Sequence, residues 1–568
     1  MRNSSFMKGT RPSTGEGSRP VPPFPTRQML VLAICRICEP IAFMGIFPYI
    51  YFMIEDFHIT EDKSRISFYA GMVTSAFTFA EFSTGLLWGR LSDKVGRKPV
   101  LLTGLIGTAI SVLIFGFAPN LTVALIARAV GGLLNGNMGV LQTTVTELIT
   151  SKEHQPRAYT VMPVVWCLGS IVGPMIGGAL ARPCISYPSL FSPGTIWDRY
   201  PYLLPNLFSA FVVFIGVVNG ILFLEETHAE KKLSRDRGLE LGNWILSGLP
   251  ILRKCAEPRD EKSKLAEMET QPLIDHDDEQ LPGYRTNENS PESSPRIRSA
   301  SVPSISWDSL DLEGGRVDSN LGISRIFNRP VILNIISFGI LAFHTMTFDQ
   351  LFPVFLSTAP PEHPSPISLP FKFVNGFGLD SKTVGIILSA QGAYQLVLNV
   401  FIIPPVLKHF GPRRLFRFLV IAYFSLYLVT PYLVLLPEEY RMIGVGMVLI
   451  WKCTFASMAY PSNAIMTADS APSKLALGTI NGVAASTASL CRAFGPTISG
   501  ILYTIGLKTG YSGLAWWCSA LVAIGGAVVG LQIREPVSCT GDKMVPTNDA
   551  EAGQPESTQV TGRAAASG

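Results

Sequence analysis

The stretch Gly89-Arg-Leu-Ser-Asp-Lys-Val-Gly-Arg-Lys98 is a basic, glycine-containing segment between two long apolar runs. One run, Ile66 to Trp88, leads into it, and another, Pro99 to Ala118, follows it. As helices, both runs are long enough to cross the roughly 30 Å hydrocarbon core of a bilayer. We therefore predict that the quoted stretch is a short turn between two membrane-spanning helices.

The composition of the whole chain agrees with a membrane protein. Of its 568 residues, 47% are hydrophobic and only 15% are charged, and the mean hydropathy is +0.31. These values exclude an ordinary soluble enzyme as the default interpretation. The nine cysteines are scattered along the chain, so no disulfide framework is predicted.

Twelve apolar spans predict an all-α membrane protein with twelve transmembrane helices in two six-helix halves, residues 28–224 and 330–533. We expect a disordered N-terminal tail (1–27), a disordered linker (225–329) and a disordered C-terminal tail (534–568), because these segments are polar or rich in charge, Ser and Pro. The predicted spans are Gln28–Ile54, Ile66–Trp88, Pro99–Ala118, Val123–Leu148, Ala158–Leu180, Tyr202–Leu224, Val331–Leu356, Thr383–Val406, Leu415–Leu435, Met442–Met466, Leu477–Leu507 and Ser512–Ile533.

The charge pattern of the loops predicts the orientation in the membrane. The loops after the second, fourth and eighth spans are basic, whereas the loop after the first span, Glu55 to Asp62, is acidic. By the positive-inside rule, both termini are then cytosolic. No cleavable signal peptide is expected, since the first apolar run is too long for a signal core.

The two halves contain similar motifs at similar positions. Lys408-His-Phe-Gly-Pro-Arg-Arg414 follows the eighth span where Asp93 to Lys98 follows the second, although it has no acidic residue. Gly495-Pro496-x3-Gly500 in the eleventh span is similar to Gly173-Pro174-x2-Gly177-Gly178 in the fifth. Such duplication is typical of transporters built from repeats around a central site.

The quoted stretch resembles the motif between helices 2 and 3 of the major facilitator superfamily, and every fixed position of that motif matches. The resemblance implies a secondary transporter whose halves rock around a midplane site. It also implies a gate made of Gly89, Asp93, Gly96, Arg97 and Lys98 that stabilises the outward-open state. We expect the glycines to permit a tight turn, Asp93 to receive Arg97, and the other cations to face anionic lipid headgroups. A role in topology alone is the alternative.

The fourth span contains Arg128-x3-Gly132-x3-Gly136, which resembles a second motif of the same family. An unpaired charge in hydrocarbon is costly, so Arg128 must find a partner, while glycines at a spacing of four allow close helix packing. The resemblance implies that Arg128 takes part in proton coupling. A purely structural ion pair is the alternative.

The fifth span contains Gly169-x3-Gly173-Pro174-x2-Gly177-Gly178, which resembles the antiporter motif of the drug:proton antiporter branch. We expect these residues to pack tightly and bend against the opposite half. The segment Leu224 to His228 is also similar to the acidic end of the sixth helix in that branch. The resemblance therefore implies export coupled to proton entry.

In the first span, Cys35-Arg36-Ile-Cys38-Glu39-Pro40 places Arg36 and Glu39 three residues apart, so that they can pair on one helix face. We reject a metal or redox site at the two cysteines because no further ligands have supporting spacing. The segment resembles fungal relatives of the plant zinc-induced facilitator-like transporters.

Ionisable residues inside spans are functional candidates by default. The candidates for proton coupling are Glu39, Glu81, Arg128 and Asp349, with the reservation that Asp349 would be a plain surface charge if it lay near the outer end of its helix. The candidates for lining the substrate cavity are Arg36, Trp166, Trp451, Lys452 and Arg492.

The linker contains three short features. Leu239 to Leu252 could form an amphipathic helix on the membrane surface, and the basic spacing around Ser299 and Ser301 suits a kinase. Glu269-Thr-Gln-Pro-Leu273-Ile274 resembles the acidic dileucine signal (Glu269, Leu273, Ile274) that adaptors read on proteins bound for vacuoles. Both a vacuolar and a plasma-membrane location stay open.

The function expected from the resemblance is proton-coupled antiport that exports small organic molecules, such as drugs or secondary metabolites, or sequesters them in the vacuole. No ATP-binding loop is present in the sequence. The proton gradient is the expected energy source, with no cofactor, no metal, no enzymatic activity, no nucleic-acid partner and a monomeric state. The alternatives are a facilitator or symporter for a sugar, amine or metal chelate, and a non-transporting membrane sensor.

Overall fold

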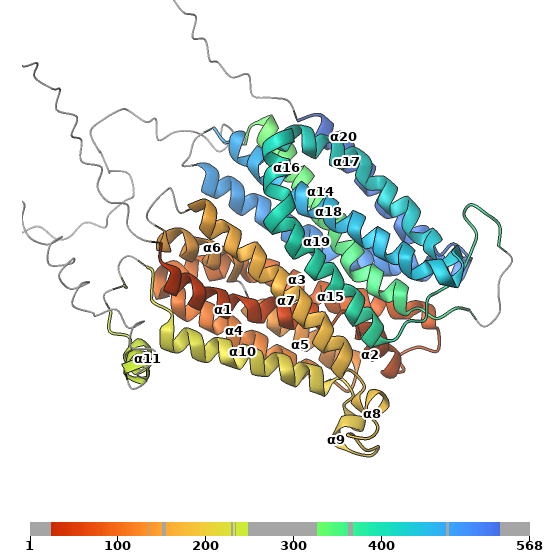
Figure 1. Cartoon of the computed structure of the whole chain (residues 1–568), viewed down its shortest axis with the longest axis horizontal. Coiled ribbons are helices and arrows are strands. Elements are labelled where there is room, and N and C mark those ends of the chain that lie inside the picture. The colour runs from red at the N-terminus through yellow and green to blue at the C-terminus, as the bar shows by residue number, and fades with distance from the viewer. Residues whose placement is uncertain are drawn as a thin grey trace, which may run out of the picture. The chain divides into compact units, whose positions relative to one another are not determined.

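The computed structural model describes residues 24–135, 137–149, 155–228, 231–232, 234–247, 327–361, 367–472 and 476–533. Helices occupy all twelve predicted positions within these ranges (Figure 1). The first half contains α1 (Thr26–Met44), α2 (Ile50–Asp56), η1 (Lys63–Arg65), α3 (Ile66–Val95), α4 (Arg97–Gly116), α5 (Leu121–Leu134), α6 (Asn137–Leu148), α7 (Gln155–Leu180), α8 (Pro183–Ser186), α9 (Ile196–Arg199) and α10 (Leu203–Phe223). The second half contains α14 (Arg329–Ser357), α15 (Ser381–Val397), η3 (Leu398–Ile402), α16 (Ile403–Phe410), α17 (Pro412–Val429), η4 (Thr430–Leu435), α18 (Glu438–Asp469), α19 (Ala476–Thr509) and α20 (Leu514–Leu531).

Nine helical segments among the described residues are long and apolar enough to cross a membrane. The other three predicted spans correspond to α1, α3 and α19, which are helical but richer in small and polar residues. Small and polar residues favour contacts between helices over contacts with lipid. These three helices therefore have the composition of helices that pack inside a membrane bundle.

Two of the predicted spans are interrupted. The first span is divided between α1 and α2, and the interruption starts at Gly45, next to α7. A Cβ atom at Gly177 of α7 would lie 2.0 Å from the Gly45 carbonyl oxygen, so the two backbones touch here. The fourth span is divided between α5 and α6 after Asn135. The prediction of a continuous helix was wrong for the first span. For the fourth span, Leu121–Leu148 is long and apolar enough to cross a membrane as one segment, as predicted, and residue 136 lies outside the described residues.

The turn predicted from Gly89 to Lys98 consists of a single residue. Residues Gly89 to Val95 form the last turns of α3, and Arg97 already begins α4. Between them, Gly96 has φ +114°, a conformation that side-chain-bearing residues rarely adopt. The prediction of a longer loop was therefore wrong, and the direction of the chain changes at one glycine.

The two halves meet along two helix pairs, α3 with α19 and α7 with α15. A Cβ atom at Gly71 of α3 would lie 2.3 Å from the Pro496 carbonyl oxygen of α19. A Cβ atom at Gly385 of α15 would lie 2.5 Å from the Pro174 carbonyl oxygen of α7. Close backbone approach at small residues thus holds the halves together, as in many membrane helix pairs.

The contacts between α3 and α19 lie toward the start of α3 and the end of α19. Asp62 and Lys508 form an ion pair of 2.6 Å, and the Thr504 hydroxyl donates to the Ser64 carbonyl at 2.8 Å. At the other end of α3, a Cβ atom at Gly85 would meet nothing within 4 Å. The halves are therefore in contact on the side away from the Gly96 turn, while α3 has open space beside it near that turn.

The beginning of the predicted linker is folded. Residues 225–228 follow α10 closely, and α11 (Arg237–Ser247) packs against the last turn of α10. The prediction of disorder was wrong for this part, whereas α11 agrees with the helix predicted from Leu239 to Leu252 as far as residue 247, where the described range ends. The tails 1–23 and 534–568, the residues Glu269, Leu273 and Ile274, and Ser299 and Ser301 lie outside the described residues.

Candidate functional site

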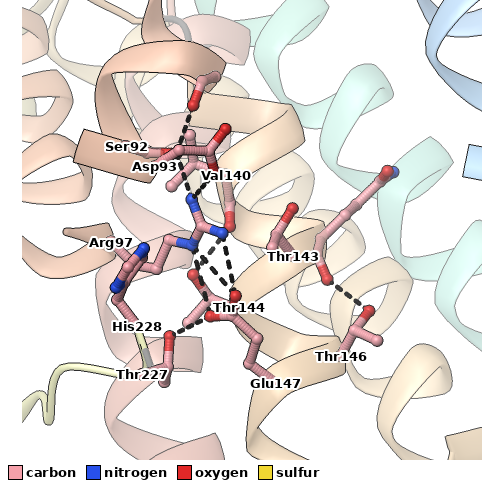
Figure 2. A network of polar contacts seen from close by, with 12 residues as sticks. Ser92, Asp93, Arg97, Val140, Thr143, Thr144, Thr146, Glu147, Thr227 and His228 are labelled. Carbon is pink, nitrogen blue, oxygen red and sulfur yellow. Dashed lines mark hydrogen bonds and ion pairs between the residues drawn. The ribbon is translucent and has the colours of Figure 1, made fainter. Parts of the chain in front are cut away.

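The Arg97 side chain is the centre of a polar network at the Gly96 turn. Its Nη1 atom donates to Asp93 Oδ1 at 2.5 Å and to the Ser92 hydroxyl at 2.7 Å. Its Nη2 atom donates to Glu147 Oε1 of α6 at 3.0 Å. Figure 2 shows the guanidinium between these carboxylates. The predicted pair of Asp93 and Arg97 is present, and it is joined to a helix that the motif itself does not include.

The carboxylate of Glu226 caps the start of α4. It accepts the backbone N–H of Arg97 at 2.8 Å and that of Lys98 at 3.1 Å. A negative charge at a helix N-terminus satisfies free N–H groups and favours the helix dipole. A Cβ atom at Gly96 would lie 2.5 Å from the same carboxylate, so Gly96 is required for space as well as for its backbone angle.

Lys98 is buried and paired, which corrects the expectation that it faces lipid headgroups. Its side chain is 8% exposed, and Nζ donates to Asp236 at 2.6 Å and to the Ile221 carbonyl at 2.9 Å. Burial raises the pKa of Asp236, but the hydrogen bond and charge of Lys98, together with the backbone N–H groups of Leu239 and Gly238, more than offset this effect and lower the pKa below its ordinary value. The start of α4 is thus tied directly to the start of the linker.

Gly89 does not have the role that the sequence predicted. A Cβ atom there would meet nothing within 4 Å, so this glycine makes no close helix contact in this conformation. Within the motif, only Gly96 is required by local geometry.

The first half contains a cluster of intramembrane charges. Arg36 pairs with Glu39, as their spacing predicts, and its guanidinium lies 5.5 Å from the centre of the Trp166 ring. Arg128 is 2% exposed and lies over the Phe77 ring at 4.4 Å. Its Nε and Nη2 atoms have no hydrogen-bond partner among the described residues. Arg128 therefore depends on aromatic and longer-range electrostatic contacts for its stabilisation.

Two further groups complete this region. Glu39 and Arg128 line the same small cavity, together with Thr108, Ser111 and Asn135. The half-buried carboxylate of Glu81 on α3 interacts electrostatically with Arg492, Arg36 and Arg128, in decreasing order. Since Arg492 belongs to α19, Glu81 connects the charges of the two halves.

The second half contains a matching pair. Lys452 of α18 binds Asp349 of α14, and its Nζ atom lies 5.7 Å from the centre of the Phe348 ring. Asp349 is 28% exposed, and it neutralises a lysine that is 5% exposed. The alternative that Asp349 is a plain surface charge was wrong. Trp451 packs edge-on against Phe455 at 6.0 Å.

The antiporter-like motif packs against both halves. Cβ atoms at Gly169 and Gly173 would lie 2.5 Å from Pro40 Cγ and 2.7 Å from the Ile41 carbonyl oxygen of α1. Only at Gly178 would a Cβ atom meet the opposite half, 2.4 Å from the Ser381 carbonyl oxygen of α15. Pro174 of the motif also contacts the opposite half, through Gly385 of α15. The expectation of packing against the opposite half is therefore correct for Pro174 and Gly178 and wrong for the first two glycines.

The cysteines of the first helix contact α10. The Cys35 thiol donates to the Gly216 carbonyl and the Cys38 thiol to the Val212 carbonyl, each at 3.4 Å. These thiols hold α1 against α10.

The family model of the Major Facilitator Superfamily matches residues 32–496 of this chain. The chain belongs to this superfamily. A multidrug transporter of the same superfamily, mfsB from Aspergillus fumigatus, is 50% identical over 98% of this chain and 90% of its own length. The Arabidopsis thaliana protein Zinc Induced Facilitator-Like 1 is 25% identical over 85% of this chain and 84% of its own.

Among solved structures, a bacterial homologue of the human lysosomal transporter Spinster, in an inward-facing and unoccupied conformation, is similar in fold. Its TM-score is 0.56 at 12% identity, covering 91% of this chain and 99% of the other. The chain is thus a multi-pass membrane protein of the twelve-helix major facilitator fold, and the resemblance that its sequence predicts is confirmed.

Sequence reasoning missed three residues that the structure brings into these sites. Glu147 binds Arg97, Asp236 binds Lys98, and Lys508 pairs with Asp62 between the halves. Glu147 ends an apolar span next to a basic segment, which was a usable signal. Asp236 lies in a polar segment and carried no comparable signal.

Proposed function

We propose that this protein is a secondary active transporter that exports small organic molecules from the cytosol, or sequesters them in the vacuole, in exchange for protons. The similarity to a multidrug transporter of the same superfamily supports the substrate class. The observation that carries the mechanism is the position of Glu81, a carboxylate of α3 that interacts electrostatically with Arg492 of α19, in the other half.

Glu81 can couple protonation to the arrangement of the halves. When ionised, it attracts Arg492 and favours the contact between α3 and α19. When protonated, it loses this attraction, since the interaction depends on its negative charge. A substrate that occupies the space between the halves and binds the ionised carboxylate competes with the proton, and such competition is what exchange transport requires.

Alternating access then needs the contacts on one side of the halves to break while those on the other form. The bonds that must break include those of Asp62 with Lys508, Thr504 with Ser64, and Thr497 with Ser75 at 2.8 Å, all between residues 62–75 and α19. They also include the bond of the Ser389 hydroxyl of α15 to the Ile171 carbonyl of α7 at 2.9 Å. With cytosolic termini, this structure is the inward-facing state. The Arg97 network lies at the side that closes in the opposite state.

The test is uptake into proteoliposomes driven by an imposed pH gradient, with ethidium, a neutral steroid and carboxyfluorescein as cationic, neutral and anionic probes. Glu81→Gln should abolish uphill accumulation but keep exchange of labelled for unlabelled probe. Glu61→Gln, a matched change of an exposed carboxylate in the loop before α3, should transport like the unchanged protein. Accumulation that survives Glu81→Gln would contradict the role of Glu81.

One observation favours symport of an anion as a second candidate. Away from the helix ends, the described membrane helices contain four cations, Arg36, Arg128, Lys452 and Arg492, and three carboxylates, Glu39, Glu81 and Asp349. An anion bound at the surplus cation would favour the protonated form of a nearby carboxylate. Protons would then move in the same direction as the substrate, which the same liposomes distinguish.

Location and linker function are separate parts of the proposal. Adaptor recognition of Leu273 and Ile274 would direct the protein to the vacuole, and replacing both with Ala should shift a fluorescent fusion to the plasma membrane. If the protein were a non-transporting sensor, no probe would be transported by any variant.

A further inference from the structure

Helix α11 lies directly on the end of α10. A Cβ atom at Gly238 would lie 2.4 Å from the Ile221 carbonyl oxygen. A Cβ atom at Gly242 would lie 2.1 Å from the Leu222 carbonyl oxygen. In Figure 1, α11 is viewed almost down its helix axis, whereas the axis of α10 runs across the picture. The two helices therefore cross steeply, so α11 lies across the end of a membrane-spanning helix instead of extending it.

Asp236 fixes the start of α11 to the gate. One of its oxygens, Oδ1, accepts the backbone N–H groups of Gly238 at 2.9 Å and Leu239 at 3.3 Å, which is the geometry of a helix N-cap. The other oxygen, Oδ2, accepts from Lys98 Nζ at 2.6 Å. The position of α11 and the position of the Lys98 side chain are thus coupled through one carboxylate.

The outer face of α11 is apolar and exposed. Leu241, Trp244 and Ile245 are 50%, 73% and 37% exposed, and their spacing places them on one side of the helix. On α10, the apolar residues Phe214 and Ile221 are 61% and 41% exposed. Because Ile221 contacts Gly238, the apolar surface continues from the membrane-spanning helix onto α11.

We propose that α11 is a membrane-surface anchor that lies in the headgroup region of the bilayer and inserts Leu241, Trp244 and Ile245 toward the acyl chains. The lipid surface is the occupant that the structure favours, because the exposed face continues the apolar surface of α10, a helix that spans the membrane. Tryptophan is enriched at this depth. The exposed cations Lys232 and Arg237 suit anionic headgroups, which attract such residues near the surface.

The anchor ties the lipid surface to the gate. When α11 is seated in the headgroup region, Asp236 stays beside Lys98; when it leaves the membrane, the carboxylate and its N-cap are released together. This role goes beyond transport chemistry and does not depend on whether transport is coupled to protons.

The first test uses nanodiscs containing brominated phospholipids, which quench only indoles at acyl-chain depth. The signal of residue 244 is obtained by subtracting the fluorescence of Trp244→Phe from that of the unchanged protein. We expect brominated lipid to quench most of this difference signal and aqueous acrylamide to quench little of it. The matched control, Asn243→Trp on the Trp244→Phe background, moves the indole to the neighbouring exposed polar position and should show the opposite pattern.

Quenching of residue 244 by acrylamide and not by brominated lipid would overturn the proposal. Protection from both quenchers would also overturn it, because another protein segment would then cover this face.

The second test measures the link to the gate with a water-soluble carbodiimide, which joins a lysine amine to an adjacent carboxylate. In nanodiscs, the yield of the Asp236–Lys98 cross-link should fall at least threefold in Trp244→Glu, because a charge opposes insertion. Asn243→Glu adds the same charge at a water-facing position and should keep the yield. An unchanged yield in Trp244→Glu would overturn the coupling between the lipid surface and the gate.

Discussion

The ion pair of Asp62 and Lys508 is the most accessible of the contacts that hold the two halves together. The nitrogen and oxygen atoms are 2.6 Å apart, and the two side chains are 39% and 41% exposed. Ser64 also donates its hydroxyl to Asp62 at 2.5 Å. Replacing Asp62 with Asn, or Lys508 with Gln, removes the ion pair and keeps side chains of similar size.

The expected magnitude follows from this exposure. Exposed ion pairs contribute about 0.2–1 kcal/mol. Losing about 0.5 kcal/mol should roughly double the population of the state in which the halves are separated on this side, relative to the closed state, in which they are in contact there. Asp62→Asn also removes the ion pair of 3.7 Å with Arg65, whereas Lys508→Gln removes only the pair between the halves. The double variant should therefore match Asp62→Asn, because the second change finds no remaining partner to remove. Exchanging the two charges should restore the closed state, and high salt should weaken the effect of every change.

The pH dependence has a definite sign. The hydrogen bond from Lys508 is the largest of the effects that lower the pKa of Asp62 below its ordinary value. The pair therefore stabilises the closed state fully above the ordinary Asp pKa of about 4, and this stabilisation is lost as the pH falls through the lowered pKa. Between pH 5 and 8, the pair should contribute the same stabilisation.

Distances between spin labels placed at the ends of α2 and α19 would measure this equilibrium by double electron–electron resonance. Additive effects of the two single changes in the double variant, or distance distributions that neither change alters, would refute the reasoning.

Three further changes test the gate and the second-half pair. Gly96→Ala should lower the free energy of unfolding by about 1–3 kcal/mol, because Gly96 has φ +114° and its added Cβ would meet Glu226. Thermal unfolding in detergent should show this loss. Gly89→Ala, at a position with open space around it, should leave the unfolding temperature unchanged. Glu226→Ala should cost about 0.5–2 kcal/mol through loss of the α4 cap; an unchanged unfolding temperature would contradict the capping role. Asp349→Asn should cost about 3–5 kcal/mol by leaving Lys452 charged and buried, and Asp349→Asn combined with Lys452→Met should recover much of it; equal losses in both variants would contradict a charge-pair origin.

The parts that the sequence predicted correctly depend on local spacing. Arg97 pairs with Asp93 four residues earlier, and Arg36 pairs with Glu39 three residues later. The Arg36–Glu39 pair follows from helix periodicity. Asp93 lies in the last turn of α3 and Arg97 begins α4, so that pair was predicted from opposite charges within one short segment. The apolar spans were predictable for the same reason, since each depends on a continuous local composition.

The parts that the sequence could not predict depend on packing between distant segments. Whether Asp349 is a surface charge depends on Lys452, which lies 103 residues away in the chain. Gly89 and Gly96 are equal members of one motif, but only Gly96 lies against the Glu226 carboxylate. Periodicity within a helix cannot identify such partners.

The most direct test of proton-coupled antiport is the direction of proton movement when a substrate gradient is the only driving force. Proteoliposomes would be loaded with whichever probe the protein accumulates and diluted into probe-free buffer of the same pH, with a pH-sensitive dye inside. Antiport predicts that the interior becomes acidic as the probe leaves, and that Glu81→Gln abolishes this change. An interior that becomes alkaline would establish symport, and probe efflux without any pH change would contradict coupling to protons.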